Sequence, residues 1–135
     1  MNRFNHLFCF SLLIAILVCN TGCEPQLAGP QKLEFDLDPD DIRTILVDPS
    51  SSEHVLSLVA RSDGPPIKIF VYLSEDDEAV FQAIMFGKTT DKIIASQTDR
   101  ATISLNAKIP AKKEAAIRLQ TDSPQKAKVT LTITN

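Results

Sequence analysis

Few side chains in this sequence could act as a nucleophile or bind a soft metal. The 135-residue chain has three cysteines, Cys9, Cys19 and Cys23, and two histidines, His6 and His54. It contains no Gly-x-Ser-x-Gly segment, which would place a serine on a nucleophile elbow. A tetrahedral zinc site needs four nitrogen, sulfur or carboxylate ligands, and beyond Cys23 the chain has one histidine and no cysteine. We therefore predict no catalytic residue, no zinc centre and no enzymatic activity, with His54 a solvated turn residue.

Acidic side chains are the better candidates for binding a metal. Asp36, Asp38, Asp40 and Asp41 form one oxygen-rich cluster, and residues 75–78 form a second. Calcium takes six to eight oxygen ligands, and acidic loops at one end of a β-sandwich could supply them. Each cluster also has a purely structural interpretation, as a solvated strand followed by a turn and as the acidic start of a helix. The four aspartates are the predicted calcium candidates; no other cofactor is expected.

Aromatic residues that could form a binding surface are scarce, since the chain has one tyrosine and no tryptophan. Phe70 and Tyr72 lie on the outer side of a predicted strand over 67–73. Either the helix that follows covers them, or they form a small interaction patch for a protein or a glycan.

The charge balance argues against nucleic-acid binding. Arg3 is the only charged residue among the first 22, so the rest of the chain carries 13 basic and 17 acidic residues, a formal net charge of −4. Nucleic-acid binding requires a clustered basic surface. Four lysines, Lys112, Lys113, Lys126 and Lys128, could meet anionic lipid headgroups or simply keep the domain soluble.

The N-terminal segment has the pattern of a signal peptide. Arg3 supplies a short positive region, and 7–19 is an apolar run of 13 residues, too short for a spanning helix of about 20 residues. Ordinary secretion and an uncleaved anchor are the alternatives to the interpretation that follows.

Residues 20–23, Asn-Thr-Gly-Cys, resemble the lipobox of bacterial lipoproteins. In that family a diacylglyceryl group joins the cysteine thiol and the signal peptidase cuts immediately before it. The resemblance implies a signal peptide over 1–22, a lipid on Cys23 and anchoring in a membrane of the cell envelope. Residues 24–31 contain two prolines and one glycine and are expected to be a flexible tether with a reach of roughly 15 Å.

From Lys32 to the end, apolar residues recur mostly with a period of two. Such alternation indicates strands with one face on a core and one in water, and turn signals separate them. The expected strands are 33–37, 42–47, 55–60, 67–73, 103–107, 115–119 and 129–133. We therefore predict an all-β domain over 32–135, an antiparallel jelly roll or β-sandwich of seven to eight strands.

One segment has helical spacing. Ser74 and Asp77 are spaced as a capping box, and 75–78 places negative charge at the positive end of a helix. Val80, Phe81, Ile84 and Met85 recur at helical intervals, and Gly87 can provide a left-handed stop. The spacing predicts a helix over about 75–86. By periodicity, Phe35, Phe81 and Phe86 are expected in the core.

The segments VLSLVARSDGPPIKIFVYLSEDDEAVF and ATISLNAKIPAKKEAAIRLQTDSPQKAKVTLTITN resemble bacterial pre-peptidase C-terminal-type domains in the order of their elements. The resemblance covers about 32–135 and implies a non-catalytic jelly-roll module; some members bind calcium or extracellular polymers.

Together these patterns predict a lipid-anchored envelope protein with an unidentified envelope protein as partner. The alternative is a calcium-dependent or glycan- and polymer-binding module at the cell surface.

Overall fold

The computed structural model describes residues 30–135. The predicted signal peptide, Cys23 and most of the predicted tether lie outside this part of the chain. The described residues form eight strands, a single turn of 3-10 helix and one α-helix. Their bounds are β1 Gln31–Leu37, β2 Ile42–Val47, β3 His54–Asp63, β4 Ile67–Leu73, η1 Ser74–Asp76, α1 Asp77–Met85, β5 Ile93–Arg100, β6 Thr102–Ile109, β7 Ala115–Gln120 and β8 Ala127–Thr134. Within the described residues, no helix has the length and apolar character needed to cross a membrane.

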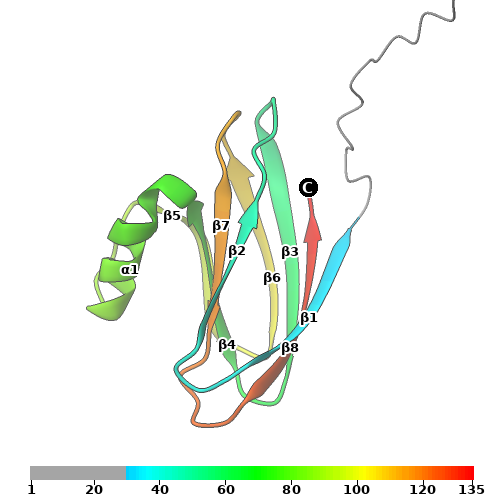
Figure 1. The fold of residues 1–135 in the computed structure, drawn as a ribbon, viewed down its shortest axis with the longest axis vertical. Coiled ribbons are helices and arrows are strands. Elements are labelled where there is room, and N and C mark those ends of the chain that lie inside the picture. Colours follow the sequence, from blue (N-terminus) through cyan, green and yellow to red (C-terminus); the bar gives the residue numbers. More distant parts are fainter. Residues whose placement is uncertain (1–29) are drawn as a thin grey trace, which may run out of the picture.

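The strands form two four-stranded antiparallel sheets with the order β1-β8-β3-β6 and β2-β7-β4-β5. The pairing is nested: β4 pairs with β5, β3 with β6, β2 with β7, and β1 with β8. This is the arrangement of a jelly roll, in which a long double-stranded ribbon is rolled into two facing sheets (Figure 1). The predicted fold class is confirmed.

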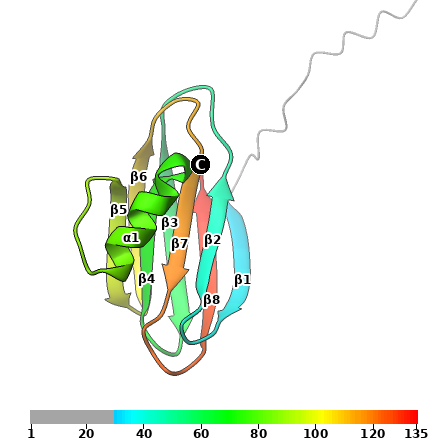
Figure 2. The same cartoon turned by 60° about the vertical axis from the view of Figure 1, so that its left-hand side comes forward.

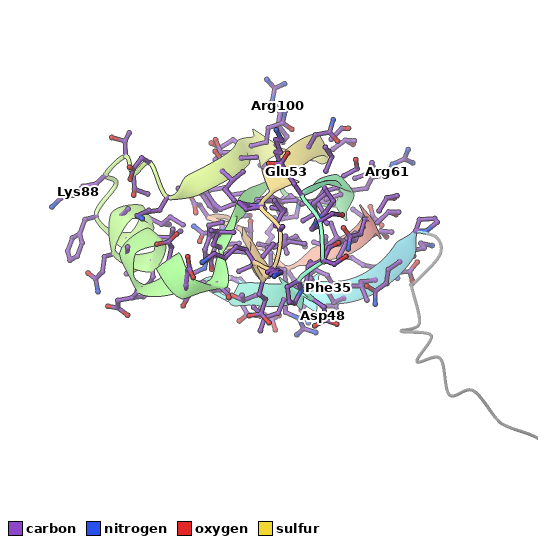
Figure 3. The ribbon with its side chains drawn as sticks, turned by 90° about the horizontal axis from the view of Figure 1, so that it is seen from above. Phe35, Asp48, Glu53, Arg61, Lys88 and Arg100 are labelled. Atoms are coloured by element: carbon purple, nitrogen blue, oxygen red, sulfur yellow. The ribbon has the colours of Figure 1, made fainter. Side chains whose placement is uncertain are left out.

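The core fills the space between the sheets. Its fully buried side chains come from the alternate positions that the period of two assigned to the inner faces, among them Leu37, Leu58, Ile69, Ile117 and Leu131. Figure 3 shows side chains filling this interior, whereas Arg61, Lys88 and Arg100 point away from the domain. Both clusters of buried apolar residues lie between residues 37 and 133. We therefore expect a chain that starts at Glu24 to fold by itself.

Strand β5 is the element that the sequence did not indicate individually. Residues Ile93–Ala95 are partly buried and Ser96 to Arg100 are exposed. Buried and exposed residues therefore do not alternate along this strand. Its pairing with β4 also shifts register twice, between Ile67 and Ile69 and between Val71 and Tyr72. An irregular edge strand of this kind gives no period of two.

The helix α1 is preceded by the 3-10 turn η1, so the predicted helix over 75–86 begins and ends close to its expected bounds. Its end is a Schellman motif: the N–H of Lys88 donates to the carbonyl of Ala83 at 2.8 Å, and that of Gly87 to Ile84 at 3.2 Å. Gly87 has φ +61°, which confirms the left-handed stop.

The prediction of a capping box formed by Ser74 and Asp77 is wrong. Neither η1 nor α1 has a side-chain hydrogen bond at its N-cap, because the Asp77 carboxylate turns toward the sheet instead of back along the helix. The helix lies over the outer face of the β2-β7-β4-β5 sheet (Figure 2). We expected each strand to have one solvent-exposed face, and this is wrong for β4 and β7, which are buried on both faces.

Candidate functional site

A polar cluster of two buried residues, Tyr72 and Arg118, and the half-exposed Asp77 joins α1 to the sheet beneath it. The Tyr72 hydroxyl donates to Asp77 Oδ1 at 2.5 Å, and Arg118 Nη2 donates to the same oxygen at 2.9 Å. Arg118 is 5% exposed although it is charged. Its guanidinium also lies over the rings of Tyr72 and Phe81, 5.7 and 5.2 Å from their centroids. The positive charge of Arg118 is therefore stabilised by one carboxylate and by the faces of two aromatic rings.

Strand register brings these residues together. Arg118 on β7 lies opposite Phe70 on β4 and Thr44 on β2, and Tyr72 lies opposite Ala116 in the neighbouring row. Side chains two residues apart on a strand share a face, so Tyr72 and Arg118 both project beneath α1. Because Asp77 is the first residue of that helix, a single turn of chain carries it from the end of β4 onto them.

The cluster holds its phenol in the protonated form. Burial and the hydrogen bond to Asp77 raise the pKa of Tyr72 from 10.0 to about 12, so the phenol stays protonated at neutral pH. Arg118 Nε and Nη1 are buried and have no hydrogen-bond partner. A catalytic acid or base has a pKa near the operating pH, and Tyr72 is shifted away from it.

Phe70 and Tyr72 do not form a surface patch. Tyr72 is fully buried and Phe70 is 9% exposed, in a cluster with Val80 and Ala116 beneath the helix. The expectation that the helix covers them is confirmed, and the alternative of an exposed interaction patch is wrong. Met85 and Phe86, in contrast, are 61% and 68% exposed, so the predicted burial of Phe86 is wrong. The chain leaves the helix at Phe86, which turns its ring outward toward Lys88.

The four aspartates do not converge. Asp38–Asp41 is a tight turn in which the N–H of Asp41 donates to Asp38 at 3.1 Å, with Asp40 at φ +61°. Asp38 and Asp36 face Lys126 at 3.1 and 3.7 Å, and the hydrogen bond that Lys126 donates to Asp38 raises the pKa of Lys126. Among residues 30–135, no three acidic, histidine or cysteine side chains are placed to hold one metal ion. Calcium binding at these aspartates therefore has no geometric support.

The other candidates of the sequence are tied to local structure. The expectation that His54 is a solvated turn residue is wrong: His54 is the first residue of β3, with Nδ1 3.2 Å from the carbonyl oxygen of Ser52 and Nε2 buried without a hydrogen-bond partner. Lys113 pairs with Glu75 at 2.8 Å. Lys112 has φ +62°, and its N–H donates to Ser50 across the two loops at that end of the sandwich.

Two shallow hollows mark the outer faces of the sheets. One, of about 380 Å³, lies on the β1-β8-β3-β6 sheet and is lined by Lys32, Val59, Arg61, Thr130 and Thr132. The other, of about 370 Å³, opens where α1 begins and is lined by Thr44, Leu46, Ser74, Asp77, Glu114 and Ala116. We call the second one the Asp77 pocket. It was not anticipated from the sequence, because its walls come from three segments far apart in the chain.

The comparisons with known proteins find similarity of fold. No protein-family model and no curated protein sequence matches this chain. Among solved structures, a mitogen derived from Yersinia pseudotuberculosis is similar with a TM-score of 0.55 at 7% identity, over 78% of this chain and 85% of that one. The pre-peptidase C-terminal domain of a collagenase from Bacillus anthracis is similar with a TM-score of 0.53 at 10% identity, over 77% of this chain and 88% of that one. The periplasmic g-type lysozyme inhibitor PliG of Aeromonas hydrophila has a TM-score of 0.48 at 10% identity, covering 78% and 84% of the two chains. The resemblance to pre-peptidase C-terminal domains is thus confirmed as a likeness of fold: this chain contains a small jelly-roll domain of the same architecture.

Proposed function

We propose that this chain is an exported lipoprotein, anchored in a membrane of the cell envelope through Cys23, whose jelly-roll domain is a non-catalytic protein-interaction module. The anchor rests on the sequence: a positive start, an apolar run of 13 residues and the lipobox-like segment 20–23. One acyl chain holds a protein to a bilayer only weakly, whereas two or three chains at about 0.8 kcal/mol per buried CH₂ hold it stably.

What supports a non-catalytic role is the use of the buried polar groups. Tyr72, Asp77 and Arg118 are bonded to one another and hold α1 on the sheet, and His54 is bonded to a backbone carbonyl. Within residues 30–135, no group of three acidic, histidine or cysteine side chains is placed to hold a metal ion. A rigid domain without reactive groups acts by presenting surface, and a surface on a short tether acts on partners close to the membrane.

A protein-interaction role is supported by apolar surface beside the Asp77 pocket. Leu46 is 58% exposed and Ile42 is 38% exposed, both on the outer face of β2. Leu46 itself lines the pocket, so apolar surface and acceptor groups meet there, and an apolar surface with polar groups around it is typical of protein contacts. No comparable observation favours the glycan- or polymer-binding alternative, because the aromatic pair that could have formed a platform is buried.

The anchor is tested by metabolic labelling with an alkyne analogue of palmitate in wild type and in Cys23→Ser. We expect label and membrane fractionation in the wild type and loss of both in the variant. Equal membrane fractionation of an unlabelled wild type would overturn the lipid anchor.

The interaction role is tested by mild amine-reactive cross-linking in native envelopes, followed by purification through a C-terminal tag. We expect one dominant protein partner in stoichiometric yield. Recovery of the chain alone, at several cross-linker concentrations, would overturn the interaction role and leave the anchor result unaffected.

A further inference from the structure

The Asp77 pocket carries an unbalanced negative charge. Arg118 neutralises Asp77 from below at 2.9 Å, but Glu114 has no cation within ion-pair distance among the described residues. The nearby Lys113 is engaged by Glu75. The hydroxyl-bearing residues Ser74 and Thr44 lie on opposite walls, and Ala116 and Leu46 add apolar surface. The pocket is therefore an acceptor-rich hollow that lacks a positive charge.

The strand beside this pocket has a free edge. β2 is the last strand of its sheet, paired with β7 on one side only. Strand edges in soluble proteins are usually blunted by charges, prolines or coverings. At the β1 edge, Lys32, Glu34 and Asp36 are all exposed, and the β5 and β6 edges lie against each other. β2 has no proline and one charged residue, Arg43. It is the edge best suited to pairing with another strand.

We infer that β2 and the Asp77 pocket together receive an extended segment of a partner protein that pairs with β2 and inserts a lysine ammonium into the pocket. This inference rests on the proposed interaction role and specifies the chemistry of the partner. A strand added beside β2 lies about 4.8 Å from it and projects alternate side chains over the same outer face. A long side chain from that strand crosses Leu46 to reach the pocket.

Lysine fits this geometry in both of its parts. Its methylene stem packs on the exposed Leu46 side chain while its head stays polar. Its ammonium has three diverging donors, which match acceptors that come from separate elements, Glu114 before β7, Ser74 on η1 and Thr44 on β2. The planar fork of arginine suits the two oxygens of one carboxylate, whereas the acceptors of this pocket come from three separate elements.

The experiment places p-benzoylphenylalanine at Ile42, on the free edge but outside the pocket lining, in the tagged full chain expressed in its native envelope. The matched control places it at Val55, which is 54% exposed on the outer face of the other sheet. On irradiation we expect the partner recovered by amine-reactive cross-linking to be captured from position 42 and not from position 55. A carbodiimide, which joins a carboxylate directly to an amine, should link Glu114 to a lysine of that partner.

Charge variants complete the test. Glu114→Lys should lower photo-capture from position 42 at least tenfold, whereas Asp91→Lys, an equal change of charge on an exposed loop, should leave it unchanged. Capture of the partner equally from position 55, capture insensitive to Glu114→Lys, or carbodiimide links only at other carboxylates would overturn this inference while the interaction role stands. Absence of any partner in the earlier amine-reactive experiment would overturn both.

Discussion

The ion pair between Asp77 and Arg118 gives the sharpest test of how α1 is held on the sheet. Arg118 is 5% exposed, and its Nε and Nη1 atoms have no hydrogen-bond partner, so Asp77 provides its one carboxylate contact. Asp77→Asn keeps the size and an acceptor oxygen but removes the negative charge. It therefore leaves a buried cation without a counter-charge.

The magnitude follows from the burial of the two partners. Removing one partner of a buried ion pair costs about 3–5 kcal/mol. Because the Asp77 side chain is 53% exposed, water screens part of the interaction, and we expect the lower end, about 3 kcal/mol. For a domain of this size that is a fall in Tm of about 10–15 °C. Arg118→Met removes the buried cation itself and should change the free energy of unfolding by less than about 1 kcal/mol.

The assay uses the single tyrosine of a chain without tryptophan, because Tyr72 fluorescence in residues 24–135 reports on this cluster during urea unfolding. The double variant Asp77→Asn, Arg118→Met should match Arg118→Met, which gives a coupling energy of about 3 kcal/mol. As a control, Glu75→Gln breaks an exposed pair of similar length, 2.8 Å to Lys113 against 2.9 Å for Asp77 to Arg118, and should cost less than about 1 kcal/mol. A cost below about 1 kcal/mol for Asp77→Asn would refute the reasoning. A cost for Arg118→Met equal to that of Asp77→Asn would also refute it, since the packing of Arg118 on the two aromatic rings would then matter more than its charge.

Three further predictions concern single features. The ultraviolet absorbance of tyrosinate should titrate with a pKa of about 12 in the folded domain, above the value of 10.0 for a free tyrosine. Because the pKa is higher in the folded state, the contribution of Tyr72 to the free energy of unfolding is complete below pH 10 and is lost between pH 10 and about 12. Tyr72→Phe should abolish this loss. Gly87→Ala should lower stability by about 1 kcal/mol in thermal unfolding, since φ is +61° there and no atom lies within 4 Å to clash; Gly87→Asn should cost less, and equal costs would point away from backbone strain. Millimolar calcium and millimolar magnesium should both leave the Tm unchanged, because Asp36 and Asp38 face Lys126; a rise with calcium alone would contradict this.

The sequence predicts most of the fold because most strands place an apolar residue at every second position, facing the core. Val129, Leu131 and Ile133 on β8, for example, all lie in the core, as a period of two requires. Strand β5 is an irregular edge and leaves no such trace. The ends of the helix are also readable, since the left-handed Gly87 is a local signal.

The site is much less predictable because its contacts are not local. Asp77 and Arg118 are separated by 41 positions, and the sequence alone places Asp77 at a helix cap and Arg118 on a wet strand face. Only the docking of α1 onto β4 and β7 turns both toward Tyr72. The available signal was the continuous apolar run of 69–73, since a strand whose two faces are both apolar must be covered on both.

The nested pairing of the jelly roll has a consequence for the order in which an exported chain acquires structure. β4 and β5 are separated by 19 residues, whereas β1 must wait for β8, whose first residue is Ala127. The entropic cost of loop closure rises as the separation grows. We therefore expect β4 and β5 to pair first and the outer pairs to form after them. β8 also fills the space between β1 and β3. A chain that emerges from a translocase N-terminus first therefore holds β1, the strand next to its proposed anchor, unpaired until β8 has crossed.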